Sequence, residues 1–288
     1  MQRPLAAVLE LEQLEERVFR GSSESISTVR VFGGQVAAQA LVAAGRTLPE
    51  PRPVHSLHAY FLRPGDPGRP TTYAVEAIRD GRSFSTRTVV ASQGDEAVFH
   101  LSASFHEPED GVVHQVPTTT APPADDLPTA DEQMATADEQ TRAWWSVLRE
   151  MFPLDLRFVD EPVRAQVLRG ERPPPRQRIY LRSATPLGDD PLVHVCALTY
   201  ASDVFLLSTA LPPHGLLMGG PDVHGSSLDH AMWFHARFRA DEWLLYDMES
   251  TWAGDGRALC RGHLFGSGGR LVATVMQEGL LRRPLGKA

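Results

Sequence analysis

Two stretches of the chain are hydrophobic at nearly every position, as helices buried inside a protein core are. Residues 194–211 contain no Gly or Pro and stop at Pro212-Pro213-His214-Gly215, which predicts one long helix. Residues 36–44 are rich in alanine, follow Gly33-Gly34 and stop at Gly45, which predicts a second helix lying close to a sheet. We expect these two helices to form the centre of the fold.

Each predicted helix precedes about four runs in which apolar and polar residues alternate, the pattern of antiparallel strands with one buried face. Turn sequences rich in Gly, Asp and Pro separate the runs. The runs after the first helix are residues 54–62, 71–79, 83–92 and 97–105, and those after the second are residues 227–238, 243–248, 257–265 and 271–277. Phrases such as Asp80-Gly81-Arg82 recur as Asp255-Gly256-Arg257, so the pattern predicts an internal duplication of a helix-on-sheet unit.

The remaining segments have weaker patterns. Residues 5–19 predict a short amphipathic helix, and residues 154–168 and 176–181 predict strands. Residues 141–151, which include Trp144 and Trp145, predict a helix that covers the joint between the halves.

The composition changes sharply once along the chain. Residues 107–140 are rich in Pro, Thr, Asp and Glu and poor in large hydrophobic residues, which predicts a linker that is partly disordered. The chain is therefore expected to hold an N-terminal unit at residues 1–106 and a C-terminal unit at residues 141–288.

The charge and hydropathy of the chain restrict its partners. Its 288 residues can bury a large core, and 42% hydrophobic with 22% charged residues is typical of a soluble globular protein. The net charge of −8 argues against nucleic acid or an anionic membrane as the main partner. No apolar run approaches membrane-spanning length, and residues 1–20 are charged and amphipathic, unlike a signal peptide. We expect a cytoplasmic protein with no membrane partner.

No metal site is expected. Cys196 and Cys260 stand alone, outside any CxxC or Cys/His spacing, and are expected to pack as small hydrophobic residues. The histidines are scattered without the spacing of metal ligands.

One carboxylate interrupts the most hydrophobic stretch. In a helix, Asp203 would be stacked against Thr199, Leu206 and Leu207. A buried carboxylate costs several kcal/mol unless it is partnered, so Asp203 has either structural hydrogen-bond donors or a function. Position alone leaves both interpretations open.

Several phrases together resemble the type II acyl-CoA thioesterase family. They are Phe32-Gly33-Gly34-Gln35, Asp80-Gly81-Arg82-Ser83-Phe84, Tyr200-Ala201-Ser202-Asp203, Leu228-Asp229-His230-Ala231-Met232-Trp233-Phe234-His235, Trp243-Leu244-Leu245-Tyr246 and Gln277-Glu278-Gly279. The resemblance extends from about residue 19 to residue 282, except in the acidic linker. It implies an α+β double hotdog fold, in which each half wraps a curved antiparallel sheet around one helix.

The resemblance also implies a catalytic set of Asp203, Ser227 and Gln277 that activates a water without a covalent intermediate or a cofactor. Ser227 stands where the family usually has Thr, and Ser keeps the hydroxyl but loses the methyl group that fixes its rotamer. The backbone N–H groups of Gly34 and Gln35 are candidate oxyanion donors, because a helix N-terminus presents unpaired N–H groups.

Each of these residues also has a structural interpretation. Ser227 could merely begin a strand, Gln277 could pair with a sheet edge, and Gly33-Gly34 could allow close helix–sheet contact. Alignment of the two halves places Gln35 near the counterpart of Asp203, which predicts one catalytic site rather than two. Asp229 and His230 are strand neighbours and should point to opposite faces, which argues against joint action.

The predicted function is that of an acyl-CoA thioesterase, which converts acyl-CoA and water to a free fatty acid and CoA. We also expect a homo-oligomer, since sheet edges in such a fold associate readily. Two alternatives remain open: a hotdog-fold enoyl-CoA hydratase, which would need an Asp/His pair converging on the substrate, and a non-catalytic acyl-CoA-binding protein.

Overall fold

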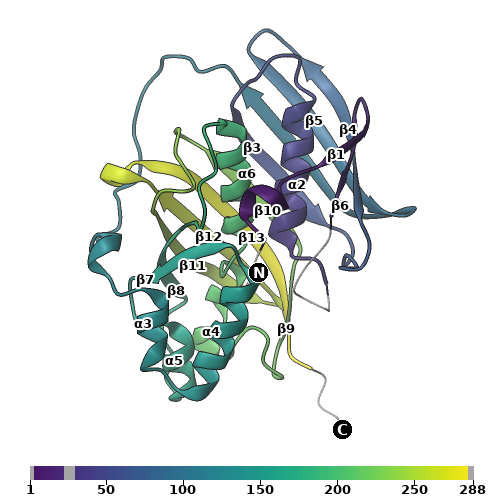
Figure 1. Cartoon of the computed structure of the whole chain (residues 1–288). Coiled ribbons are helices and arrows are strands. Elements are labelled where there is room, and N and C mark those ends of the chain that lie inside the picture. The colour runs from purple at the N-terminus through teal and green to yellow at the C-terminus, as the bar shows by residue number, and fades with distance from the viewer. Residues whose placement is uncertain (1–2, 23–29, 285–288) are drawn as a thin grey trace.

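The computed structural model describes residues 3–22 and 30–284, and their main element is one continuous antiparallel sheet of 13 strands (Figure 1). The strands are β1 Glu12–Glu15, β2 Val18–Gly21, β3 Val54–Phe61, β4 Thr71–Asp80, β5 Phe84–Gln93, β6 Glu96–His106, β7 Leu154–Phe158, β8 Arg176–Ser183, β9 His224–Ser227, β10 Asp229–Phe234, β11 Leu244–Gly254, β12 Arg257–Phe265 and β13 Leu271–Arg282. The α-helices are α1 Leu5–Val8, α2 Gly33–Arg46, α3 Ala130–Ala135, α4 Glu139–Met151, α5 Val163–Leu168 and α6 Pro191–Ser202. The 3-10 helices are η1 Ala124–Asp126, η2 Leu207–Ala210, η3 Pro212–His214 and η4 Ser267–Gly269.

The sheet consists of two halves with the same topology. From the outside inward, the order is β2-β4-β5-β6-β3 in the first half and β8-β11-β12-β13-β10 in the second. The halves join where β3 pairs with β10, with Ala59 opposite His230 and Leu57 opposite Met232. A helix precedes the four inner strands of each half, α2 in the first and α6 in the second. This repetition confirms the predicted duplication and the α+β double hotdog fold.

The two central helices lie side by side and run in opposite directions (Figure 1). The start of α2 contacts the residue after α6, where the Gly34 N–H donates to Asp203. At the other end of the pair, Gly45 lies against Leu192, which belongs to the first turn of α6. Buried alanines such as Ala40 keep the surface of α2 thin enough for this approach.

The predicted helix over residues 194–211 ends much earlier than the sequence indicates. Helix α6 stops at Ser202, Asp203 is its C-cap, and Phe205 has a φ of +68°, which no residue in a right-handed helix adopts. The hydroxyl of Tyr246 on β11 donates to the Ser202 carbonyl at 2.8 Å, which satisfies a carbonyl at the end of the helix. The prediction that Asp203 stacks against Leu206 and Leu207 along one helix is therefore wrong. Similarly, Gly45 does not end α2, which continues to Arg46.

Two other predicted elements are divided in the structure. The predicted helix at residues 5–19 is a single turn, α1, followed by the hairpin of β1 and β2. The predicted strand at residues 154–168 is β7 and then α5, because the alternation ends at Phe158 and Pro162 is the N-cap of a helix. The sequence pattern alone does not distinguish helix from strand in these two segments, because short apolar runs are compatible with the repeat of either element.

The segment between the halves is more structured than its composition predicts. Residues 107–123 have no helix or strand, but Thr118 and Tyr180 tie this stretch to the C-terminal half by hydrogen bonds to Gly269 and Pro122. Helix α3 follows, with a capping box in which Thr129 and Glu132 satisfy each other's backbone N–H groups. Residues 130–135 are therefore helical and not disordered.

Residues Pro191–His214 are long and apolar enough to cross a membrane by length and composition, with a mean hydropathy of 1.4. The prediction that no apolar run approaches this length is therefore wrong. In the structure, 67% of the most apolar window is buried, and η2 within it packs on β8, β11, β12 and β13. The hydrophobicity of this segment is accounted for by burial in the core.

Both cysteines are completely buried, as predicted, and neither is in a disulfide. Burial raises the pKa of both thiols, that of Cys260 to about 11. The thiol forms therefore persist at neutral pH.

Candidate active site

Asp203, Ser227 and Gln277 come together although they belong to three different elements. The Gln277 Nε2 group on β13 lies 2.6 Å from the Asp203 Oδ1 atom and 3.1 Å from the Ser227 Oγ atom on β9. Gln277 is completely buried, whereas Asp203 and Ser227 are half-buried and reach the surface. The three side chains thus form a small polar cluster at the end of α6.

The carboxylate of Asp203 is held by two donors from opposite halves of the protein. Its Oδ1 atom accepts from Gln277, and its Oδ2 atom accepts from the Gly34 backbone N–H at 2.8 Å. Gly34 is in the first turn of α2, where unpaired N–H groups and the helix dipole stabilise an anion. The Asp203 side chain is therefore anchored at the junction of the two halves. Each of its oxygens retains a lone pair for a further partner.

Two glycines allow this contact. A Cβ atom on Gly33 would lie 2.9 Å from Asp203 Oδ2 and 2.8 Å from the Phe61 ring, and one on Gly34 would lie 2.5 Å from the Tyr200 carbonyl oxygen. These separations are shorter than van der Waals contact. The Gly33-Gly34 pair is therefore needed for the close approach of α2 to α6 and to Asp203.

We expect Gly34→Ala to lower both stability and activity. Alanine favours a helix by about 1 kcal/mol over glycine, but a clash with a backbone carbonyl costs about 1–3 kcal/mol and moves the N–H away from Asp203. Thermal unfolding and turnover should both fall, with turnover reduced about tenfold by the weakened bond to a charged group. Gly111→Ala is the control, because its Cβ would meet nothing within 4 Å. Unchanged turnover in a folded Gly34→Ala protein would show that the contact with Asp203 is dispensable.

The other predicted oxyanion donor, the Gln35 backbone N–H, is engaged by another acceptor. The Gln35 backbone N–H donates to the Phe32 carbonyl at 3.1 Å, and its side chain donates to the Ser22 carbonyl at 2.7 Å. The Gly34 N–H is engaged by Asp203, so its role here is to anchor the carboxylate. Among the described residues the Gly33 N–H has no hydrogen-bond partner, and it is the first N–H of α2.

An irregularity in the sheet brings Ser227 and His230 to the same side. Ser227 pairs with Gly279 across β9 and β13, while Ala231 pairs with Met276 across β10 and β13, a register shift of one residue. In a regular strand, residues three apart point to opposite faces. Because the strand is interrupted at Leu228, Ser227 and His230 point to the same face, and both side chains reach the Gln277 amide.

Asp229 points away from the cluster, as predicted. Its Oδ1 atom accepts from the Glu278 backbone N–H at 2.6 Å, while the neighbouring His230 lies on the buried face. Burial raises the pKa of Asp229. The two residues do not act as a pair; Asp229 secures the break between β9 and β10.

Sequence reasoning missed His230 as a member of the site. Its Nδ1 atom lies 3.2 Å from Gln277 Nε2 and its Nε2 atom lies 2.8 Å from Ser202 Oγ, and only 1% of the residue is exposed. Burial lowers the pKa of His230, although Asp203 and Asp229 act in the opposite direction. The sequence signal for His230 is the Asp229-His230 phrase, whose alternation along a strand argues against a joint role but does not exclude one for His230 alone.

In the first half, the residue that corresponds to Asp203 is a threonine. Thr47 is the C-cap of α2, as Asp203 is the C-cap of α6, and Leu192 is the second residue of α6, as Gly34 is of α2. The buried face of β6 there presents Leu101 and Ala103 instead of a glutamine. The counterpart of Asp203 is thus Thr47, at the opposite end of α2 from Gln35, which corrects the alignment made from the sequence.

Two family models match the chain: one for the acyl-CoA thioesterase N-terminal domain at residues 22–106 and one for acyl-CoA thioesterase at residues 147–280. Human acyl-coenzyme A thioesterase 8 is 40% identical and the match covers 96% of this chain and 88% of the human one. Acyl-CoA thioesterase 2 of Haemophilus influenzae is 38% identical over 96% of both chains. The chain belongs to the acyl-CoA thioesterase family.

Solved structures agree with this assignment. The crystal structure of acyl-CoA thioesterase II from Mycobacterium marinum is 43% identical, and it matches 99% of both chains with a TM-score of 0.78. A hot dog fold protein from Alicyclobacillus acidocaldarius is 20% identical with a TM-score of 0.77, which supports the fold alone. Since acyl-CoA thioesterases are thioester hydrolases, this chain is an enzyme of that class.

Aromatic side chains pack around Phe205, two residues after Asp203. The Phe205 ring lies 6.0 Å from that of Trp144 on α4 and 6.1 Å from that of Phe158 on β7. Trp145 instead anchors α4, because its Nε1–H donates to Asp131 at 2.6 Å. Trp144 therefore packs against the segment that follows Asp203.

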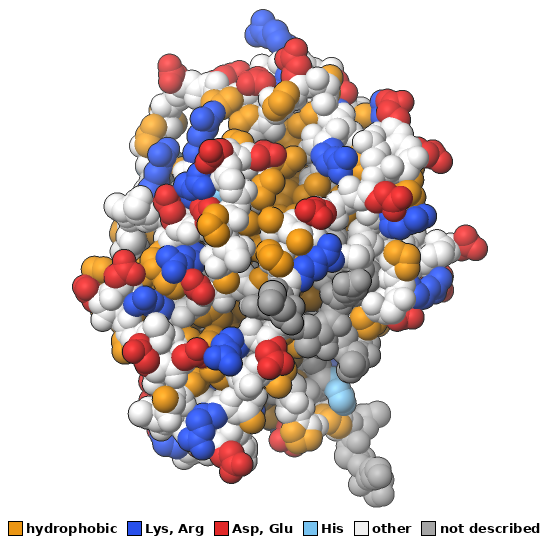
Figure 2. Space-filling view, in the orientation of Figure 1, with side chains coloured by type: hydrophobic (Ala, Val, Ile, Leu, Met, Phe, Trp, Pro, Cys, Tyr) orange, Lys and Arg blue, Asp and Glu red, His pale blue; other side chains and the backbone are white. Residues whose placement is uncertain are grey.

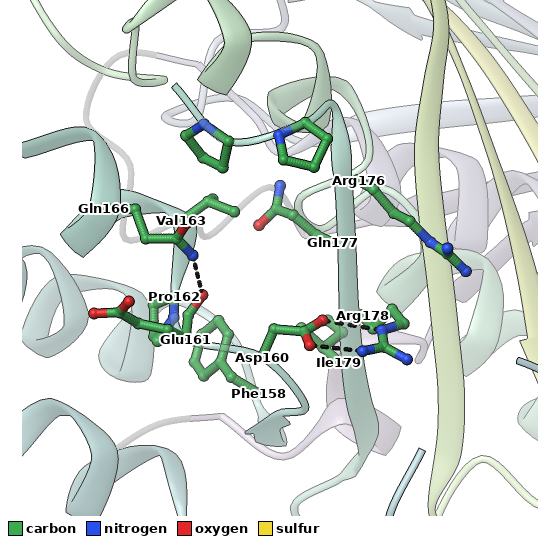
Figure 3. A pocket seen from close by; sticks show the side chains of 12 residues that line it. Phe158, Asp160, Glu161, Pro162, Val163, Gln166, Arg176, Gln177, Arg178 and Ile179 are labelled. Atoms are coloured by element: carbon green, nitrogen blue, oxygen red, sulfur yellow. Dashed lines mark hydrogen bonds and ion pairs between the residues drawn. The ribbon is translucent and has the colours of Figure 1, made fainter. Parts of the chain in front are cut away.

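A cavity of about 320 Å³ lies beside β8 and α5, away from the three catalytic candidates (Figure 3). The Gln177 side chain points into it, and ion-paired Arg178 and Asp160 lie at its edge. Gln177 also donates to Thr209, whose hydroxyl donates to the Phe205 carbonyl. The cavity is thus linked to the segment after Asp203 through hydrogen bonds, but Asp203, Ser227 and Gln277 do not line it.

Proposed function

We propose that this protein hydrolyses acyl-CoA to a free fatty acid and CoA at the cluster of Asp203, Ser227 and Gln277. The observation that carries the proposal is a half-exposed carboxylate, held by donors from both halves, beside a buried amide and a hydroxyl. This is the arrangement that general-base activation of a water requires. The names and identities of the relatives support the same substrate class.

In the proposed first step, Asp203 takes a proton from a water that attacks the thioester carbonyl. The carboxylate uses one lone pair of each oxygen for Gly34 and Gln277, so a lone pair remains for the water proton. The new C–O bond forms as the carbonyl electrons move to oxygen, giving a tetrahedral oxyanion. Asp203 is now a carboxylic acid.

Gln277 and Ser227 hold the attacking water. The Gln277 Oε1 atom is buried and has no hydrogen-bond partner within residues 3–22 and 30–284, so it can accept the second water proton. The Ser227 hydroxyl can donate to the water or accept from it. These contacts orient the water without a change in their own protonation, which leaves Asp203 as the base.

The N-terminus of α2 is the proposed site of oxyanion stabilisation. The unpartnered Gly33 N–H and the positive end of the helix dipole lie next to Asp203, as the 2.9 Å approach of a Gly33 Cβ to Oδ2 indicates. Collapse of the intermediate breaks the C–S bond, and the Asp203 proton passes to the departing thiolate. The cycle returns Asp203 to the carboxylate form.

Product analysis tests this proposal against its alternatives. Acyl-CoAs of graded chain length are incubated with the purified protein, and free thiol, free acid and hydrated acyl-CoA are each measured. We expect equal amounts of thiol and acid. Hydrated acyl-CoA without thiol would indicate a hydratase, and binding with no product at any length would indicate a binding protein. Either result would overturn the proposed function.

A further inference from the structure

We propose that His230 is a positioning residue that determines the orientation of the Gln277 side-chain amide, that is, where its NH₂ group and its oxygen lie. The inference rests on the proposed function, since the purpose of the orientation is to present the Gln277 carbonyl oxygen to the attacking water. His230 is buried behind Gln277 and contacts Gln277 and Ser202. It acts on the reaction only through Gln277.

The first step is the tautomer of His230. The Ser202 hydroxyl lies 2.9 Å from the Thr199 carbonyl and 3.3 Å from the Met232 sulfur, and neither of these atoms can donate to it. The single Ser202 proton is therefore directed away from the imidazole. Ser202 must accept from His230, so the His230 proton is on Nε2.

The second step is the consequence for Nδ1. With the proton on Nε2, the Nδ1 atom is an acceptor, and it lies 3.2 Å from the Gln277 side-chain nitrogen. The Asp203 Oδ1 atom, at 2.6 Å, is also an acceptor. Asp203 Oδ1 and His230 Nδ1, neither of which can donate, therefore face the same end of the Gln277 amide. The Ser227 hydroxyl, which can donate or accept, lies 3.1 Å from the same nitrogen, so only the NH₂ group fits at this end.

The third step is the position of the carbonyl oxygen. Because the NH₂ group faces Asp203, Ser227 and His230, the Gln277 Oε1 atom must point the other way, where it is buried and has no partner among the described residues. The flipped amide would place a carbonyl oxygen against a carboxylate and a bare ring nitrogen, which is repulsive. His230 thus keeps a buried acceptor ready for the water proton.

The environment of His230 keeps the ring neutral. Burial lowers its pKa, the ring has no ion-pair partner among the described residues, and only the nearby carboxylates of Asp203 and Asp229 favour the charged form. A charged ring would turn Nδ1–H toward the Gln277 NH₂ group and remove the acceptor. Low exposure and the Ser202 contact therefore maintain one tautomer.

The test compares two substitutions that each retain one half of the imidazole. His230→Asn keeps an oxygen near the position of Nδ1, and His230→Gln keeps a donor near Nε2 for Ser202. We expect His230→Gln to lower kcat at least about tenfold with little change in KM, and His230→Asn to restore most of that loss. Ser202→Ala, which removes the acceptor for Nε2–H, should also lower kcat. A purely structural role predicts that activity follows stability in all three variants.

A second readout does not depend on activity. Nitrogen-labelled His230, observed by NMR in the unaltered protein, should be neutral and protonated at Nε2 around neutral pH. A ring protonated at Nδ1 would overturn the inference, and so would His230→Gln with the kcat of the unaltered protein. If the unaltered protein releases no thiol while the NMR shows the expected tautomer, the proposed function has failed and the tautomer assignment stands.

Discussion

Replacement of Asp203 by asparagine should lower the rate of thiol release at least about 100-fold, because the amide cannot accept a proton from water. The change also disturbs its partners. Asparagine has one acceptor oxygen, so its NH₂ group must face either the Gly34 N–H or the Gln277 NH₂ group. An unsatisfied donor at this site costs about 1–3 kcal/mol of stability. Initial rates are measured on protein shown to be folded by circular dichroism.

Asp229→Asn is the matched control for that experiment. Asp229 is also a half-buried carboxylate in this region, but it faces away from Gln277 and uses one oxygen to accept from the Glu278 N–H, which asparagine can also do. We expect its thiol release to stay within about twofold of the original. If Asp203→Asn were as active as Asp229→Asn, Asp203 would be structural and the site would lie elsewhere.

Replacement of Gln277 by leucine should have the second largest effect. It removes the donor to Asp203, a bond to a charged group worth about 1.5–3 kcal/mol, and the buried carbonyl that would hold the water. That range corresponds to a fall in kcat of roughly 10- to 150-fold, measured under saturating acyl-CoA. Gln93→Leu is a suitable control, because Gln93 is also buried and, among the described residues, its side chain bonds to Asp66, Arg69 and Thr71 in the first half.

The pH profile of Gln277→Glu distinguishes the role of the Gln277 NH₂ group as a hydrogen-bond donor from that of its carbonyl oxygen as an acceptor. At neutral pH a second carboxylate would face Asp203 at hydrogen-bond distance, and the repulsion raises the pKa of the introduced glutamate. As the pH falls through that pKa, the protonated glutamate regains a donor, so relative activity should increase. Activity of the leucine and glutamate variants equal to that of Gln93→Leu would exclude a catalytic role for Gln277.

The strands and the duplication could be predicted from the sequence because each depends on local pattern. Alternation defined β3, β5 and β12 within one or two residues, since these strands bury one face of a sheet. The end of α6 could not be predicted. It depends on Tyr246, which follows Ser202 by more than forty residues in the chain. It also depends on a left-handed Phe205, which packs against distant aromatic rings and whose carbonyl accepts from Ser208 and Thr209.

The catalytic candidates were identified through family resemblance and not through spacing. Nothing local to Asp203, Ser227 or Gln277 shows that they meet, because they lie on a helix end and two strands of a shared sheet. Their meeting depends on the break at Leu228, which changes the face that Ser227 occupies relative to His230. A sequence without an alignment carries no signal for that one-residue shift.

The duplication predicted from the sequence also concealed a difference. The two halves share their topology, yet one end of the helix pair has Asp203 against Gly34 and the other has Gly45 against Leu192. In the first half, the buried Arg87 donates to the Thr47 carbonyl that follows α2, where the second half uses Tyr246 after α6. The sequence segments that recur in both halves correspond to strands that the halves share, whereas the candidate catalytic residues lie where the halves differ.

The central claim is that a water held by Asp203 and Gln277 attacks the thioester directly. A single-turnover experiment with enzyme in excess over acyl-CoA, quenched at successive times, tests it most directly when thiol and free acid are both measured in the presence of hydroxylamine. We expect thiol and acid to appear with one rate constant and no enzyme-dependent hydroxamate to form. Thiol that appears before the acid, or hydroxamate captured from an acyl-enzyme, would contradict the account and make Asp203 a nucleophile.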